Sequence, residues 1–194
     1  RFSKNVKRIQ SSNTDEENML NVVLLSEFRR RYAHELYSTY VKPVIMFKSQ
    51  RIDSSNEANQ TFNELIDSLT PQSIRDFLLR QKQVGNERES ETLSIAHDYY
   101  RKNDSELDQI VRDIKREFAP TRIINANDSD RGSGMLEKGQ YEALNSLESP
   151  ANLYRVIFAV AKLTEGWDVL NLYDIVRISN YKDTKGDKKT TMAE

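Results

Sequence analysis

A run of apolar and β-branched residues at 154–160, YRVIFAV, constrains the fold of this chain more than any other stretch. Such a run is typical of a strand buried on both faces, as in a parallel sheet covered by helices on each side. A polar turn at 161–168 follows it, and a second strand-like run begins at Leu172. Open α/β sheets bind ligands in turns at the carboxyl ends of buried strands. We therefore expect function to concentrate in the 161–168 turn.

The rest of the chain alternates between short apolar runs and segments with helical periodicity. Strands are predicted at 43–48, 121–126, 154–160 and 173–179. Helices are predicted at 14–40, 54–69, 70–83, 89–102, 104–118 and 135–147, with capping boxes at Thr14/Glu17 and Ser54/Glu57, an N-cap at Thr70 before Pro71, and a cap at Asp104. This alternation predicts one α/β domain with a doubly wound, mainly parallel sheet flanked by helices.

Composition limits the possible partners. The 29 basic and 30 acidic residues give a net charge of -1, so the whole surface does not attract DNA and any nucleic-acid contact must be local. The absence of cysteine excludes disulfides and thiolate metal sites. No apolar run approaches the length of a membrane span, and we expect a cytoplasmic protein. Because the chain begins with Arg1, we expect it to be a piece of a longer protein.

The first predicted helix carries both an apolar stripe and a basic cluster. The stripe consists of Leu25, Phe28, Tyr32, Leu36 and Tyr40. The arginines at 29–31 are predicted to form a solvated face, with phosphate contact as the alternative. His34 and His97 are interpreted as structural, and Tyr99 and Tyr100 as core residues, with stacking on bases as the alternative for the tyrosines.

Two segments carry a resemblance to a known family. RVIFAVAKLTEGWDVLNLYDIVRI (155–178) resembles motif V of superfamily-two helicase-type motors, in the variant typical of type III restriction endonuclease Res subunits. VKPVIMFKSQRIDSSNEANQTFNEL (41–65) is similar to the first strand and helix of their second RecA-like domain, around motif IV. The resemblance implies a RecA-like fold in which 1–41 is a lead-in helix, 70–119 a helical insertion and 154–179 the motif V region.

The resemblance assigns roles to residues of the 161–168 turn. Gly166 and Asp168 match the motif V glycine and aspartate that face the nucleotide, and Glu165 fits the restriction-subunit variant. From chemistry alone, Gly166 permits a close backbone approach, and Asp168 offers a carboxylate to a ribose hydroxyl or an arginine. The predicted nucleotide-binding set is Glu165, Gly166 and Asp168. The alternative is an ordinary strand-to-helix turn with Trp167 as a core anchor.

The resemblance also implies contacts with the DNA backbone. Many relatives use a threonine eight residues before the motif V aspartate, but this chain has Val160 there, so the contact would pass to Lys162 or Thr164. In such motors the turn at 48–55 also faces nucleic acid, and Ser49, Gln50 and Ser55 are its short polar donors. The alternative for these side chains is simple helix capping.

The chain contains neither a P-loop nor a recognisable acidic magnesium motif or nuclease constellation. The resemblance places ATP and Mg²⁺ mainly in a first RecA-like domain upstream, so no catalytic residue and no metal ligand is predicted here. It implies the second motor domain of an ATP-dependent DNA restriction endonuclease subunit. Its partners would be double-stranded DNA, the first RecA-like domain and the nuclease domain of the same chain, and a methyltransferase subunit. A DNA-repair helicase domain and a non-catalytic nucleotide- or nucleic-acid-binding module are the alternatives.

Overall fold

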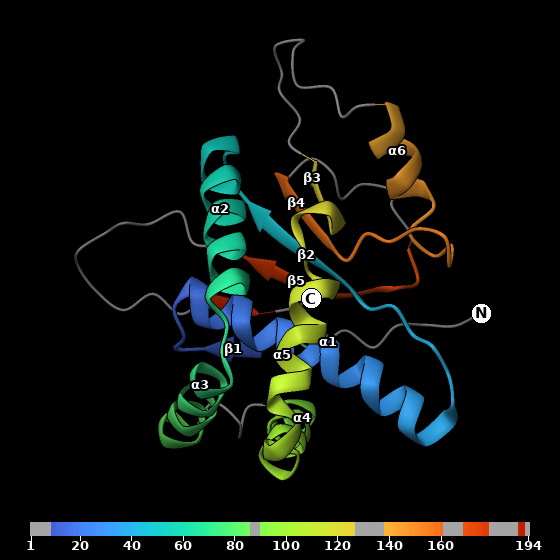
Figure 1. Cartoon of the computed structure of the whole chain (residues 1–194). Helices are drawn as coiled ribbons and strands as arrows, with labels where there is room; N and C mark the ends of the chain where they lie inside the picture. The colour runs from blue at the N-terminus through green and yellow to red at the C-terminus, as the bar shows by residue number, and fades with distance from the viewer. Residues whose placement is uncertain (1–8, 86–89, 127–137, 161–168, 179–189, 193–194) are drawn as a thin grey trace, which may run out of the picture.

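The computed structural model describes residues 9–85, 90–126, 138–160, 169–178 and 190–192. Its strands are β1 (Ile9–Ser11), β2 (Val44–Ser49), β3 (Ile123–Ala126), β4 (Val156–Val160), β5 (Leu172–Arg177) and β6 (Thr190–Met192) (Figure 1). Its α-helices are α1 (Asp15–Tyr37), α2 (Ile52–Ser68), α3 (Pro71–Val84), α4 (Glu91–Lys102), α5 (Leu107–Glu117) and α6 (Lys138–Asn145). Two short 3₁₀ turns, η2 (Asp104–Glu106) and η3 (Pro120–Arg122), precede α5 and β3.

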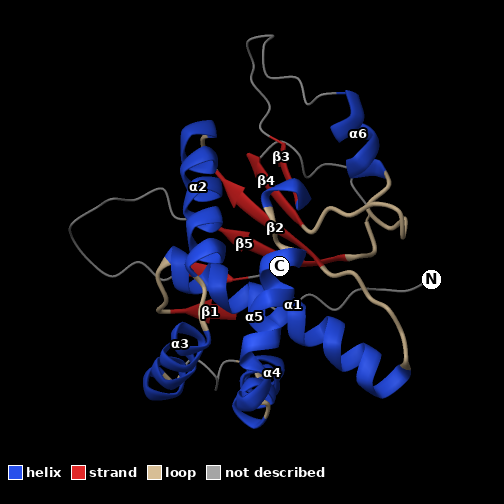
Figure 2. Ribbon diagram, viewed as in Figure 1, coloured by secondary structure: helices blue, strands red, loops and turns tan. Residues whose placement is uncertain are grey.

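The strands form one sheet in the order β1-β6-β5-β2-β4-β3 (Figure 2). β5, β2, β4 and β3 are parallel, and β2 and β4 are in register from Ile45 opposite Val156 to Ser49 opposite Val160. The predicted α/β fold with a mainly parallel sheet and flanking helices is thus confirmed, and it is consistent with a RecA-like fold. β6 and β1 extend the sheet in antiparallel fashion beside β5. Neither was among the predicted strands, because three-residue strands give no periodic signal in the sequence.

Helices cover both faces of the sheet. Alternate side chains of a strand point to opposite faces. Phe158 faces α2 and α5, where its ring centroid lies 5.0 Å from that of Phe47 and 5.8 Å from that of Phe62. Ile157 faces the other way and packs in a second core with residues of α6 such as Leu144. The larger core lies on the side of α1 to α5, and Figure 1 shows α6 apart from those five helices.

The two halves of α1 are buried very differently. Thr14 and Glu17 form the predicted capping box, and the first half of the helix is buried almost all round. The second half is not: Tyr32 is 40% exposed and Leu36 54%. The helix ends at Tyr37, and the last residue of the predicted stripe, Tyr40, lies beyond it and is 81% exposed. The predicted apolar stripe is therefore covered only as far as Phe28. The prediction of burial was wrong beyond that point because the rest of the fold does not reach the end of the helix.

Two predicted helix starts were also wrong. α2 begins at Ile52, only two residues after β2 ends, so Ser54 already lies in the first turn and forms no capping box. Asp104 lies in η2 rather than capping α5, and it accepts a 2.7 Å hydrogen bond from Arg75. The cap formed by Thr70 ahead of Pro71 is confirmed.

The helices at 71–117 pack against α1 through both apolar and polar contacts. Asn21 contacts the Nε2 atom of buried His97 at 2.7 Å, and the Tyr100 hydroxyl donates to the Leu24 carbonyl at 2.5 Å. The structural interpretation of His97 and Tyr100 is confirmed by these contacts. Within the described ranges, no helix combines the length and the apolar character needed to cross a membrane.

Candidate functional site

The four parallel strands end together at one edge of the sheet. β2 ends at Ser49, β3 at Ala126, β4 at Val160 and β5 at Arg177. Ser49 lies directly opposite Val160 in the parallel register. Because ligands of open α/β sheets bind outside the carboxyl ends of the strands, this edge is the candidate site. We call it the carboxyl edge.

The start of α2 brings a partial positive charge to the carboxyl edge. Gln50 and Arg51 form an exposed two-residue turn between β2 and α2. Arg51 is the N-cap of α2, and its side chain forms no capping hydrogen bond. The first N–H groups of a helix have no partner within the helix, and the helix dipole adds positive character there. This end of α2 is therefore chemically suited to an anion.

Two serine hydroxyls beside this turn are buried without hydrogen-bond partners. Ser49 is 2% exposed and Ser55 is fully buried, and neither Oγ atom has a partner in the described part of the chain. Neither serine caps α2, so the capping alternative is wrong for both. Leaving a buried hydroxyl unsatisfied costs about 1–3 kcal/mol. The carboxyl edge thus carries polar groups that folding alone does not use.

Further polar side chains surround the two serines. The Asn125 side chain of β3 donates a 3.0 Å hydrogen bond to Asn56 of α2 and ties these two elements together. Arg51 and Arg177 are exposed at the edge and Lys48 is half-buried, so among the described residues there basic groups outnumber the single acid in the first turn of α2, Asp53. The sequence prediction named neither arginine as a site residue. Their positions near the carboxyl ends of the strands predicted at 43–48 and 173–179 were the available signal.

Most of the predicted site residues lie outside the described part of the chain. These are Lys162, Thr164, Glu165, Gly166 and Asp168, together with Trp167 of the alternative interpretation. Their proposed roles therefore remain predictions. Ser49 and Gln50 are described, and both lie at the carboxyl edge next to the end of β4. Among the described residues there is no cluster of three or more potential metal ligands.

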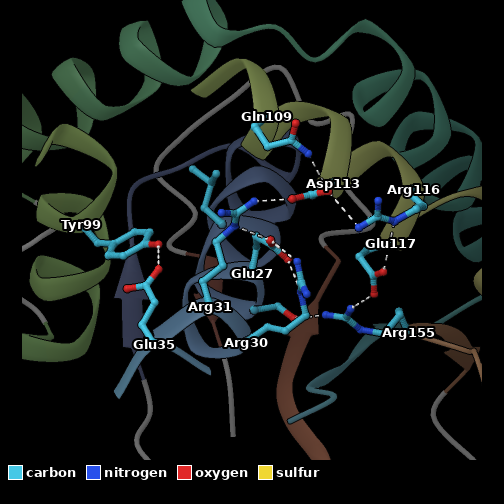
Figure 3. A network of polar contacts seen from close by, with 12 residues as sticks. Glu27, Arg30, Arg31, Glu35, Tyr99, Gln109, Asp113, Arg116, Glu117 and Arg155 are labelled. Atoms are coloured by element: carbon cyan, nitrogen blue, oxygen red, sulfur yellow. Dashed lines mark hydrogen bonds and ion pairs between the residues drawn. The ribbon is translucent and has the colours of Figure 1, made fainter. Parts of the chain in front are cut away.

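At the amino ends of the strands, charged groups are buried in a connected network (Figure 3). Glu27 of α1 is fully buried and accepts hydrogen bonds of 2.7 Å from both Arg30 and Arg31. The hydrogen bond with Glu27 raises the pKa of Arg30. Arg31 also pairs with Asp113 of α5. Neither the solvated face nor the phosphate contact predicted for these arginines is correct, because they pair with carboxylates of the fold.

Arg155, directly before β4, completes the network. Its side chain is 1% exposed and donates to the Pro43 carbonyl at 3.0 Å, to Ser26 Oγ at 3.1 Å and to Glu117 at 2.5 Å. Its guanidinium lies 4.9 Å from the centroid of the Phe118 ring. Burial lowers the pKa of Arg155, while the negative charge of Glu117 opposes that effect. Because every one of these partners belongs to the fold, the role of Arg155 is structural.

Asp174 of β5 is a second buried charge. It is 2% exposed and pairs with Arg29 of α1, whose guanidinium also lies 5.4 Å from the centroid of the Tyr173 ring. Burial raises the pKa of Asp174, although the charge of Arg29 and its hydrogen bond act in the opposite direction. Asp174 lies within β5, and Arg155 lies within the apolar run predicted at 154–160. A charged residue inside such a run was the sequence signal for a buried ion pair.

Comparison with known proteins gives one informative match. The chain is 29% identical over 196 residues to the probable type III restriction-modification enzyme HindVIP Res subunit of Haemophilus influenzae, covering 97% of this chain and 38% of that protein. The chain thus spans well under half the length of this relative. No family model matches the chain. No solved structure matches it either. The similarity confirms the predicted resemblance to Res subunits but does not identify the corresponding domain.

Proposed function

We propose that this chain is the second RecA-like motor domain of an ATP-dependent DNA restriction endonuclease subunit, and that its carboxyl edge contacts the DNA backbone. The observation that carries the proposal is the pair of buried hydroxyls of Ser49 and Ser55 beside the start of α2, which have no hydrogen-bond partner among the described residues. The similarity to a Res subunit supplies the biological setting, a restriction-modification enzyme.

The chemistry of the edge suits a phosphate group. Helix N-termini and short hydroxyl donors both bind phosphate oxygens. Arg51 and Arg177 add positive charge next to them. Ser49 and Gln50 would contact the backbone from β2, and Lys162 and Thr164 would do so from the segment after β4. Such contacts carry no sequence information, which suits a motor that moves along DNA or switches state on it.

The nucleotide would lie at the same edge. Glu165, Gly166 and Asp168 follow β4, with Asp168 binding a ribose hydroxyl or an arginine of the neighbouring domain. ATP and Mg²⁺ would be held mainly by the first RecA-like domain of the same polypeptide, and they supply the phosphoryl transfer that drives the motor. A nuclease domain of that polypeptide would cut double-stranded DNA, and a methyltransferase subunit would complete the complex.

The test uses the complete Res-like polypeptide. Asp168→Ala should lower DNA-stimulated ATP hydrolysis tenfold or more, which corresponds to about 1.4 kcal/mol of activation free energy. The free energy of unfolding should stay within about 1 kcal/mol of wild type. Asp108→Ala is the matched control, because it removes the same charge from an exposed position on α5. Unchanged hydrolysis in a folded Asp168→Ala variant would contradict the nucleotide role.

A further inference from the structure

We infer that the exposed end of α1 is a docking surface for another protein domain of the same Res-like polypeptide. This surface, the α1 tip, consists of Tyr32, Leu36, Tyr37 and Tyr40, which are 40%, 54%, 73% and 81% exposed. Single exposed apolar residues are normal, but a group at one helix end is typical of an interaction surface. The inference rests on the proposed function only in requiring a polypeptide longer than this chain.

The apolar stripe of α1 runs on past the point where the fold covers it. Leu25 and Phe28 are 3% and 5% exposed and lie in the core. Tyr32 and Leu36 continue the same stripe, and the rings of Phe28 and Tyr32 are in contact with centroids 5.0 Å apart. Figure 1 shows this end of α1 extending beyond the other helices and the sheet. A helix with an apolar stripe buries that stripe against another layer.

The loop after α1 folds back and enlarges the tip. Ser38 ends the helix in the left-handed conformation with φ 50°, and its backbone N–H donates to the His34 carbonyl at 3.0 Å. Tyr40 then returns to the helix, with its ring centroid 5.1 Å from that of His34. The tip is therefore an ordered surface of helix and loop, formed before any partner binds.

The position of the tip leaves the proposed ligand site open. Tyr40 lies four residues before β2 begins, so the tip lies on the side where the parallel strands start. The carboxyl edge, with Ser49 and the start of α2, lies at the other end of the same strands. A domain docked on the tip would not compete with DNA or nucleotide at the carboxyl edge.

The charges around the tip favour a protein over a nucleic acid. The three arginines that precede the tip pair with carboxylates of the fold: Arg29 with Asp174, and Arg30 and Arg31 with Glu27. Contact with nucleic acid needs cations directed at phosphates. The centres of protein interfaces instead are rich in tyrosine and depleted of charge. The tip therefore has the composition of a protein interface.

The occupant follows from the length of the related subunit. The aligned region is 38% of the Haemophilus influenzae Res subunit, so most of a polypeptide of this kind lies outside the match. An apolar surface carried by that additional chain is held at high effective concentration by the covalent connection. It therefore reaches the tip more readily than a separate molecule does, and a second copy of the chain is the competing occupant.

Site-specific photocrosslinking in the complete polypeptide tests the inference. Benzoylphenylalanine replaces Tyr37 in one variant and Leu79, 59% exposed on α3, in the matched control. We expect position 37 to crosslink to peptides outside 1–194 of the same polypeptide, with a yield that does not depend on protein concentration. Crosslinks from position 37 to a second copy or to added DNA would overturn the inference, and so would a yield no higher than at position 79.

A second measurement remains informative if the bulky probe disturbs the tip. Tyr37→Ala should increase the rate of limited proteolysis between the docked domains about tenfold, as expected for removal of an aromatic anchor. Leu79→Ala should not change that rate, and equal rates in the two variants would overturn the inference. DNA affinity of Ser49→Ala, measured separately, tests the proposed function, so failure of one proposal is distinguishable from failure of the other.

Discussion

Arg155 at the amino ends of the parallel strands and two serines at their carboxyl ends differ in whether their buried polar atoms have partners. At the amino ends, Arg155 is bound by Pro43, Ser26 and Glu117, all of them groups of the fold. At the carboxyl ends, the hydroxyls of Ser49 and Ser55 are equally buried but have no partner in the described residues. A satisfied network maintains the structure, whereas unsatisfied groups at a sheet edge indicate a place for a ligand.

Charged side chains also have different roles at the two ends of the strands. Glu27, Asp113, Glu117 and Asp174 bind the arginines on the amino side, so charge there serves the packing of α1 and α5 against the sheet. On the carboxyl side Arg51 is exposed and serves no helix cap. Burial alone therefore does not identify function in this fold. Arg155 differs from Ser49 and Ser55 in that its partners lie within the fold, whereas the two serine hydroxyls have none among the described residues.

The largest expected effect is at Arg155. Arg155→Ala removes the donor to Ser26, one of the two donors to the Pro43 carbonyl and the shortest ion pair of Glu117, so the free energy of unfolding should fall by about 3–5 kcal/mol. Arg116→Ala is the control: its side chain is 61% exposed and also pairs with Glu117, and its loss should cost less than about 1 kcal/mol. Urea denaturation measures both variants, and equal losses would contradict the structural role of the network.

The next effect concerns pH. Burial raises the pKa of Asp174 above its ordinary value, so this carboxyl ionises less readily in the folded chain than in the unfolded one. As pH rises from below the ordinary value to above the raised one, wild type should lose stability relative to Asp174→Asn. Asp104→Asn is the control of opposite sign, because the hydrogen bond from Arg75 lowers the pKa of Asp104. The stability of wild type relative to Asp104→Asn should therefore decrease as pH falls. If both stability differences, wild type minus Asp174→Asn and wild type minus Asp104→Asn, changed in the same direction with pH, the opposite pKa shifts of these two carboxyl groups would be contradicted.

The local pattern of apolar and polar residues was sufficient to predict most of the helices and strands. The buried ion pairs were not predicted, because their two residues lie far apart in the sequence. The strands from β2 to β5 were predicted within a few residues because buried parallel strands have continuous apolar runs. Arg155 and Asp174 were not singled out, since their partners Glu117 and Arg29 lie 38 and 145 residues away in the chain. A pairing of that kind is a property of the tertiary structure.

For the candidate site too, the sequence predicted some features and only the structure showed the others. The position of Ser49 and Gln50 at a strand end followed from the alternation of strands and helices. That the buried serines have no partner within the described ranges required the structure. Periodicity also overestimated the burial of α1, since a stripe predicts which side of a helix is apolar but not how far its cover extends. Leu36, at 54% exposed, is the clearest example.

A serine-to-alanine substitution at each end of the parallel strands gives a direct test of the difference between the two ends. Ser26 donates to the Pro43 carbonyl and accepts from Arg155, so Ser26→Ala should cost about 1–2 kcal/mol of unfolding free energy. Ser49→Ala removes a hydroxyl that has no partner in the described part of the chain, so stability should be unchanged or higher by up to about 1 kcal/mol. Urea denaturation of the pair measures the difference. If Ser49→Ala lost as much stability as Ser26→Ala, the hydroxyl of Ser49 would have a structural partner. The two ends of the strands would then not differ in whether their buried serines are satisfied by the fold.

The smallest effect on the fold is expected at Arg51. This side chain is exposed and caps nothing, so Arg51→Ala should change the free energy of unfolding by no more than about 0.5 kcal/mol. If Arg51 neutralises one phosphate at the carboxyl edge, the slope of log affinity against log salt should fall in magnitude by about one in the complete polypeptide. The loss of affinity should be similar for all DNA sequences, because a phosphate contact does not read bases. Arg112→Ala, which removes an exposed arginine from α5, is the matched control and should leave the slope unchanged. Equal slopes for wild type, Arg51→Ala and Arg112→Ala would show that DNA does not reach the start of α2, which would leave the buried serines beside it without a ligand.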